Sequence, residues 1–321
     1  MDSHTNTLIP PPITSRRSIS PIVLWIFGLV VLALVIGGAY YAFEKYSSGV
    51  DKQVFVSFST ADLYTLDLSK KGAQAPQLLT LSSSQTKTLG PVLEAARGTK
   101  DVYYLIESAD RTYANIYSGS ATNSAAPLKQ ITPSKTLKTG LSYDPGSGSF
   151  AYLSHTAATS TLAFPDITYF DPSTGEERKI GEGNTVELMS GGLYALIRNQ
   201  NQLIVVSTQT GKGQVVLPFD NTSPFAFDPK TNTLAIYYES AHEIQYFSLK
   251  SILSASYESS VPVTAMPSSM TYVSGTLWVA FAGKDSIQLE PAGATSPSAV
   301  VSYPASFGKD VHPVTLLPTY E

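Results

Sequence analysis

The sequence predicts an all-β protein, a six-bladed β-propeller preceded by one transmembrane helix, and three observations lead to this prediction. The stretch at residues 143–154 returns in a related form at residues 227–240, and the two Asp-Pro turns are 84 residues apart, or two periods of 42. The chain also has 22 Gly, 21 Pro and 19 Tyr, with few helix-favouring runs beyond residue 50. One long uncharged apolar segment lies near its start. A repeat of about 40 residues built as strand, tight turn and strand is typical of a propeller blade.

The amino-terminal part divides into a polar tail, an apolar span and a short linker. Residues 1–20 are polar, Pro-rich and without apolar periodicity, so we expect a flexible tail. Residues 21–43 carry no charge. At about 1.5 Å per residue this span reaches roughly 34 Å, which is enough to cross a hydrocarbon core of about 30 Å. Residues 44–53 are then a juxtamembrane linker.

Charge predicts how this span is oriented. Arg16 and Arg17 precede it, whereas the charges that follow nearly balance, so the amino end is expected in the cytoplasm and the carboxy-terminal domain outside. A cleaved signal peptide is the alternative, but its apolar region would run only about 7–15 residues, so we favour an uncleaved anchor. Small residues four apart, such as Ala33 and Gly37, would allow two spans to pack as a weak homodimer.

Two strands of each blade can be followed through residues 54–321. The anchors of the second strand are separated by 48, 48, 43, 41 and 43 residues, and they are Val54, Val102, Phe150, Leu193, Leu234 and Leu277. A third-strand signature, a polar residue followed by Ile or Leu and then alternation, begins at Asp62, Asn115, Asp166, Gln202, Glu243 and Ser286. Two strands that register six times predict six blades, with seven as the alternative.

The first strand of each blade predicts how the ring closes. It recurs five times, beginning at Pro91, Leu141, Val186, Pro224 and Met270, but the blade that contains Val54 lacks it at its amino end. The matching pattern, HPVTLL, stands at residues 312–317. We therefore expect the carboxy-terminal strand to pair within the first blade, which would protect edges that would otherwise be exposed.

On these residues the chain resembles TolB-like and related WD-type propeller repeat proteins. In those repeats an aromatic-Asp/Ser-Pro turn leads into an apolar strand and a later Asp-Ile-Tyr-like strand. The matching positions are Tyr143-Asp144-Pro145, Phe227-Asp228-Pro229 and Asp166-Ile167-Thr168-Tyr169. Two blades match well and the other four are degenerate. Because these motifs specify fold and not activity, the resemblance implies a binding scaffold.

No catalytic residue, cofactor or metal site is predicted. The chain has no cysteine, which excludes disulfides, thiol catalysis and zinc-thiolate sites, and its four histidines are scattered. Lys138-Thr139-Gly140 copies a short box of penicillin-recognising enzymes, but that box needs a helix-borne Ser at a far larger separation, so we interpret the match as chance. A net charge of −4 without Lys/Arg runs interleaved with aromatics argues against nucleic acid.

The binding surface is predicted from the general layout of propellers. Loops that join the second and third strands share one face with the connections between successive blades. These loops are expected at residues 107–113, 155–165, 198–201, 239–242 and 284–285. They supply the predicted ligand-binding residues Arg111, His155, Arg198, Glu239 and His242. The turns of the opposite face are mostly Gly, Ser, Thr and Asp, so specificity is expected on the first face.

The sequence thus predicts a membrane-anchored module that binds a protein, peptide or glycan outside the cytoplasm, and not an enzyme. Two alternatives stay open. A propeller-fold hydrolase, lyase or quinone-cofactor dehydrogenase would require clustered His, Asp, Glu or Arg in the central funnel. A structural or assembly component of an envelope complex would use the propeller to hold other proteins together.

Overall fold

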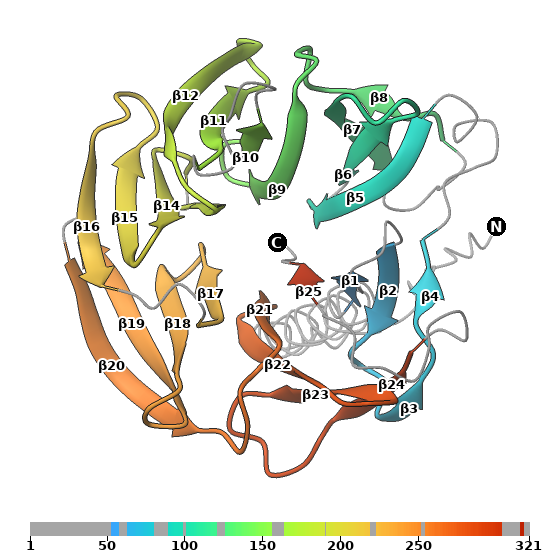
Figure 1. Ribbon diagram of the computed structural model, residues 1–321, viewed down its shortest axis with the longest axis vertical. Coiled ribbons are helices and arrows are strands. Elements are labelled where there is room, and N and C mark those ends of the chain that lie inside the picture. Colours follow the sequence, from blue (N-terminus) through green and yellow to red (C-terminus); the bar gives the residue numbers. More distant parts are fainter. Residues whose placement is uncertain are drawn as a thin grey trace, which may run out of the picture. The chain divides into compact units, whose positions relative to one another are not determined.

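The computed structural model describes residues 53–57, 63–79, 89–98, 101–120, 126–155, 164–189, 191–218, 223–251, 254–303 and 315–317, all within one compact unit, Asp51–Glu321. All the regular secondary structure in this described part of the chain is β-strand, and the strands form six sheets that follow one another around a ring (Figure 1). The expected tail and transmembrane span lie outside these ranges. Within them, no helix has the length and apolar character needed to span a bilayer.

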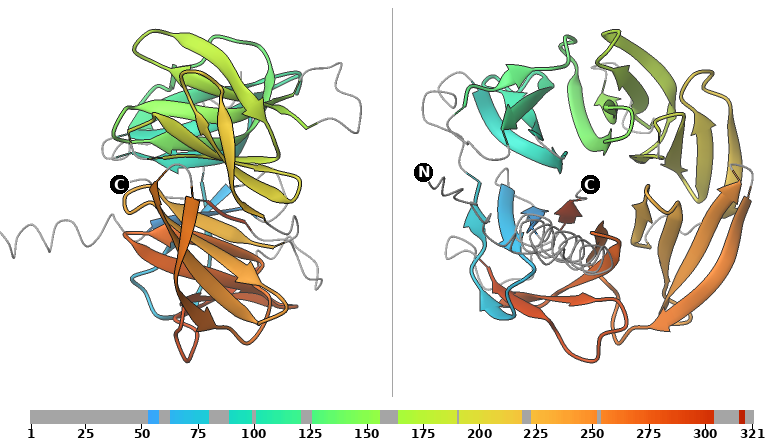
Figure 2. Two further views of the ribbon diagram at one scale, coloured as in Figure 1. Left: turned by 90° about the vertical axis from the view of Figure 1, so that its left-hand side faces the viewer. Right: turned by 180° about the vertical axis from the view of Figure 1, so that it is seen from behind.

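Each sheet is one blade, and its strands lie side by side in order from the centre of the ring to its rim (Figures 1 and 2). Blade 1 contains β25 (Thr315–Leu317), β1 (Gln53–Ser57), β2 (Leu63–Asp67) and β4 (Gln77–Leu78). Blade 2 contains β5 (Leu89–Arg97), β6 (Asp101–Ser108), β7 (Ala114–Ser120) and β8 (Lys129–Gln130). Blade 3 contains β9 (Leu137–Asp144), β10 (Ser149–His155), β11 (Asp166–Asp171) and β12 (Glu176–Glu182).

The second half of the ring has the same pattern. Blade 4 contains β13 (Thr185–Leu188), β14 (Tyr194–Asn199), β15 (Gln202–Ser207) and β16 (Gly213–Pro218). Blade 5 contains β17 (Phe225–Asp228), β18 (Thr233–Tyr238), β19 (Glu243–Ser251) and β20 (Ser254–Pro262). Blade 6 contains β21 (Ser269–Val273), β22 (Thr276–Ala282), β23 (Ser286–Pro291) and β24 (Ala299–Ser302), with β3 (Gly72–Gln74) added at its outer edge.

The prediction of six blades is confirmed, and the seven-bladed alternative is wrong. Five of the six second-strand anchors lie inside β1, β6, β10, β18 and β22. The sixth, Leu193, precedes β14 by one residue and is 56% exposed. Gly191 and Gly192 both have positive φ, so a turn occupies the positions where the pattern predicted the strand to begin.

The predicted closure of the ring is also confirmed. β25 pairs antiparallel with β1, with Phe55 opposite Leu317 and Ser57 opposite Thr315, so the carboxy-terminal strand is the innermost strand of blade 1. A second link was not predicted: β3, which follows β2 in the chain, pairs parallel with β24 of blade 6. The first and last blades are therefore joined at both their inner and outer edges.

The core lies between neighbouring blades. Tyr143 and Phe150 of blade 3 pack against Tyr103 of blade 2, with ring centroids 4.6 and 4.8 Å apart for the two pairs that include Tyr103. Six of the seven residues of β10 are buried in succession. Because both faces of a central blade strand contact a neighbouring blade, hydrophobic alternation is weak in the middle of the blades.

Candidate functional site

The innermost strands of all six blades surround a central channel of about 490 Å³. Its lining combines apolar side chains, such as Leu93 and Met270, with Ser, Thr and charged side chains. We call its end beside the second-to-third-strand loops the channel mouth. The channel mouth is lined by Asn184, Arg198, Ser223, Phe225 and Ser268.

Polar side chains of the innermost strands hydrogen-bond from one blade to the next. Ser142 Oγ of blade 3 donates to Glu187 Oε2 at 3.0 Å and accepts from the backbone N–H of Leu188 at 2.8 Å. Ser269 Oγ of blade 6 accepts from the backbone N–H of Leu316 at 3.0 Å. These partners are 45–47 residues apart, which is close to one repeat. The same kind of polar contact between neighbouring blades, here called a joint, therefore recurs around the channel.

Glu94 forms the corresponding joint between blades 2 and 3. Its two carboxylate oxygens accept from the backbone N–H groups of Gly140 and Leu141, each at 2.7 Å. Burial raises the pKa of Glu94, while these two donors act in the opposite direction. Gly140 has a φ of 65°, and a Cβ there would overlap the side chain of Leu153, so glycine is favoured at this position.

Arg198 is the predicted site residue that lines the channel. It lies near the end of β14 and is half-buried. Its Nε donates to Asn184 Oδ1 at 3.1 Å, and its guanidinium carbon lies 5.6 Å from the ring centroid of Phe225, which belongs to blade 5. Burial lowers the pKa of Arg198, but a guanidinium remains charged at neutral pH. The arrangement holds one positive charge at the channel mouth.

His155 lies at the end of β10, and its Nε2 is 2.8 Å from Thr139 Oγ1. Burial lowers the pKa of this imidazole. Thr139 directly precedes Gly140, which lines the channel. His155 is therefore bonded to a residue that is next to the channel lining.

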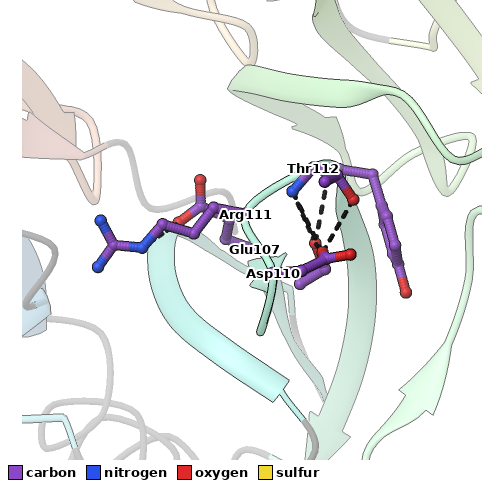
Figure 3. Close-up of polar contacts among 6 residues, drawn as sticks. Glu107, Asp110, Arg111 and Thr112 are labelled. Atoms are coloured by element: carbon purple, nitrogen blue, oxygen red, sulfur yellow. Dashed lines mark hydrogen bonds and ion pairs between the residues drawn. The ribbon is translucent and has the colours of Figure 1, made fainter.

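Arg111 lies in the turn between β6 and β7, and its side chain is 74% exposed. Its Nε is 3.8 Å from Glu107 Oε2. Figure 3 shows that Arg111 extends away from the contacts of this turn, in which Asp110 Oδ1 accepts from the backbone and hydroxyl of Thr112 at 3.2 and 2.8 Å. The Asp110 contacts fix the turn, and Arg111 is left in solvent.

Glu239 and His242 lie in the turn between β18 and β19, and both are exposed. The backbone N–H of His242 donates to the Glu239 carbonyl at 3.2 Å, and His242 Nδ1 lies 3.4 Å from Tyr237 Oη. The five predicted residues therefore occupy second-strand ends or second-to-third-strand turns. Their contacts lie within their own blades, except that Arg198 also packs against Phe225 of blade 5. The structure therefore distributes the five residues over one face and does not converge them on one point.

Lys138 is a polar group that the sequence interpretation missed. It is fully buried, and its Nζ donates to Ser134 O at 2.8 Å, Ala114 O at 3.0 Å and Asn115 Oδ1 at 3.1 Å. Burial lowers its pKa to about 8. These partners lie in β7 and in the connection to β9, so Lys138 joins blades 2 and 3. Within the Lys-Thr-Gly match, the Lys and the Gly therefore both support a joint between blades.

The described residues contain no group of three or more His, Asp or Glu arranged to hold a metal ion. The architecture defines the class of protein, a six-bladed β-propeller with a central channel, and comparison with solved structures supports this fold. The chain is similar to TolB from Acinetobacter baumannii, with a TM-score of 0.54 and 13% identity, over 84% of this chain and 67% of that one. It is also similar to a chain of a nidogen–laminin complex, with a TM-score of 0.53 and 11% identity, over 82% and 98%.

The resemblance to TolB-like propellers is thus confirmed for the fold. No family model matches the sequence, and a search of curated proteins found no match.

Proposed function

We propose that this chain is a membrane-anchored propeller that binds a protein partner outside the cytoplasm. The binding surface is the face that bears Arg111, His155, Arg198, Glu239 and His242, here called the loop face. The observation that carries the proposal is Arg198, a charged group held half-buried by Asn184 and Phe225 at the mouth of a channel of about 490 Å³. Ligand sites are commonly concave, partly apolar and equipped with a few well-fixed polar groups.

A protein partner is favoured over a glycan by one comparison. The nidogen–laminin structure is a complex of two proteins, and one of its chains has this fold. In this chain the second-to-third-strand turns of the loop face, such as residues 239–242, are exposed and stand on a rigid scaffold, which suits a protein partner.

Site-specific photocross-linking in cells that naturally express the chain tests the surface. A photoreactive amino acid is placed at Arg111 or Glu239 on the loop face, and at Glu176 or Lys212 in exposed positions next to third-to-fourth-strand turns. The two loop-face positions should give a protein adduct of the same mass, and the other two should not. Adducts of equal yield from both faces, or a glycan-only adduct, would refute the proposal.

The anchoring has a separate test, since it rests on Arg16, Arg17 and the apolar span at residues 21–43. Protease added to intact cells should digest the propeller and spare a fragment containing residues 1–20. Full protection of the propeller until the cells are lysed would place it in the cytoplasm. Release of a soluble form that begins near residue 40 would show instead that the span is cleaved.

A further inference from the structure

Arg198 carries a positive charge that the described part of the chain does not neutralise. Its Nε is used by Asn184, but the two terminal guanidinium nitrogens have no hydrogen-bond or ion-pair partner among the described residues. Two acidic side chains also line the channel, and both are engaged elsewhere. Glu94 accepts two backbone N–H groups, and Glu187 accepts the hydroxyl of Ser142.

The orientation of Arg198 is fixed from both sides. Asn184 binds it twice, because the backbone N–H of Asn184 donates to the Arg198 carbonyl at 3.0 Å and Asn184 Oδ1 accepts from Arg198 Nε. Gly183 allows this approach, since a Cβ at that position would lie 2.7 Å from Ile197 Cγ2 and in contact with the Arg198 carbonyl. The ring of Phe225 lies against the guanidinium from the next blade. A side chain held in this way loses little rotamer freedom when it binds a ligand.

This geometry suits one kind of ligand group. A guanidinium whose Nε is already used still offers its two terminal nitrogens, and partial burial strengthens their hydrogen bonds by excluding water. The planar fork matches a carboxylate, which can accept two parallel N–H bonds. The adjacent phenyl ring and the apolar side chains of the channel lining suit a peptide chain that carries such a group.

We infer that Arg198 binds a carboxylate of a peptide segment that enters the channel mouth, and that Asn184 positions the guanidinium for it. The inference rests on the proposed function and names the chemical group that the partner protein presents. The carboxylate belongs either to the carboxy terminus of the peptide or to an Asp or Glu side chain, and the experiment distinguishes these two sources.

The test uses the purified full-length chain in detergent and three pools of random heptapeptides. The first pool lacks Asp and Glu and has a free carboxy terminus. The second lacks Asp and Glu and is amidated. The third is amidated and contains one Glu. Peptides that remain bound after size exclusion are quantified by mass spectrometry.

At least one carboxylate pool should be retained about tenfold more than the amidated pool without Glu, which corresponds to one charge-assisted pair. Arg198→Gln should reduce this retention to that of the amidated pool, and Arg198→Lys should reduce it partly, because the charge stays but the fork is lost. Arg178→Gln is the matched control. Arg178 is also half-buried and lies 5.0 Å from the ring centroid of Tyr169, but it belongs to the outer strand β12.

Equal retention of all three pools, or unchanged carboxylate retention by Arg198→Gln, would overturn the inference. Melting temperatures verify that each variant is folded. Asn184→Ala provides a second variant, which keeps the Arg198 guanidinium but removes the side chain that holds its Nε. The failure of this inference can be separated from failure of the proposed function. If only the inference fails, the loop-face adduct still forms in cells; if the proposed function fails, that adduct is absent.

Discussion

At the scale of the residue, the joints between blades depend on a few polar groups placed among apolar neighbours. Lys138 is the clearest example, since its ammonium group is buried among carbonyl and amide oxygens from blade 2 and from the connection to blade 3. The ring of Tyr152 lies 5.5 Å from this nitrogen, and Tyr152 Oη donates to Glu177 at 2.9 Å. Removing water from a charged group is unfavourable, so its protonation should be coupled to folding.

The pH dependence of stability tests this coupling. Burial lowers the pKa of Lys138 from about 10.5 to about 8, so between these values the unfolded chain binds the proton more readily than the folded one. The contribution of Lys138 to the free energy of unfolding should therefore increase as the pH rises from 8 to 10.5. Denaturant unfolding at pH 7.5, 8.5 and 9.5 should show the wild type gaining stability relative to Lys138→Met. Lys129→Met, at an exposed position in β8, is the control. A wild-type advantage over Lys138→Met that does not change with pH would contradict the coupling.

At the scale of the element, the sequence predicted the strands well and their joints poorly. The third-strand signatures at Asn115, Asp166 and Glu243 all fall at strand starts or inside strands, because alternation and turn residues are local properties. Glu94, Ser142 and Lys138 gave no local signal. Each acts on a residue about one repeat away or in the preceding blade, and a contact of that range depends on the closed ring.

The candidate site was predictable in part for the same reason. The face could be derived from strand order, since the loops at residues 109–113 and 239–242 follow from the positions of neighbouring strands. The special position of Arg198 could not be derived, because it depends on Asn184 across the sheet and on Phe225 in the next blade.

Removal of the Ser142 hydroxyl tests the joint between the first strands of neighbouring blades. Ser142 is buried, and Ser142→Ala would leave the buried backbone N–H of Leu188 without the acceptor that it has now. We expect a loss of about 1–3 kcal/mol in the free energy of unfolding, the usual cost of an unsatisfied buried donor. Ser173→Ala, which removes a hydroxyl from an exposed turn, should change it by less than about 0.5 kcal/mol. Equal effects of the two substitutions would show that the joint adds no stability.

At the scale of the whole molecule, the two ends of the propeller sequence close the ring. Leu316 packs into the cluster of Val54, Val56 and Ala280 between blades 1 and 6, while Leu317 packs with Phe55 and other residues between blades 1 and 2. The short strand β25 thus supplies apolar contacts on both of its sides. The parallel pairing of β3 with β24 adds a second link at the rim.

Deletion of residues 311–321 tests the closure. The truncated chain loses β25, which exposes the inner edge of β1 and removes Leu316 and Leu317 from two core clusters. Its calorimetric transition should become broad or fall sharply in temperature, because blade 1 loses its innermost strand and both neighbouring cores lose an apolar side chain. Deletion of residues 318–321 alone, which keeps β25, is the control. An unchanged transition after the longer deletion would show that the ring does not depend on this strand.

The central claim is that the loop face binds a partner protein, and charge reversal measures this most directly. The affinity of the partner identified by cross-linking is compared for Arg111→Glu with Arg198→Glu and for Glu176→Lys with Lys212→Glu. Each pair changes two exposed or half-exposed charges on one face of the same propeller. The loop-face pair should weaken binding by about tenfold or more, since charged groups in a binding site contribute on this scale. An equal loss from both pairs, or a larger loss from the second pair, would contradict the account.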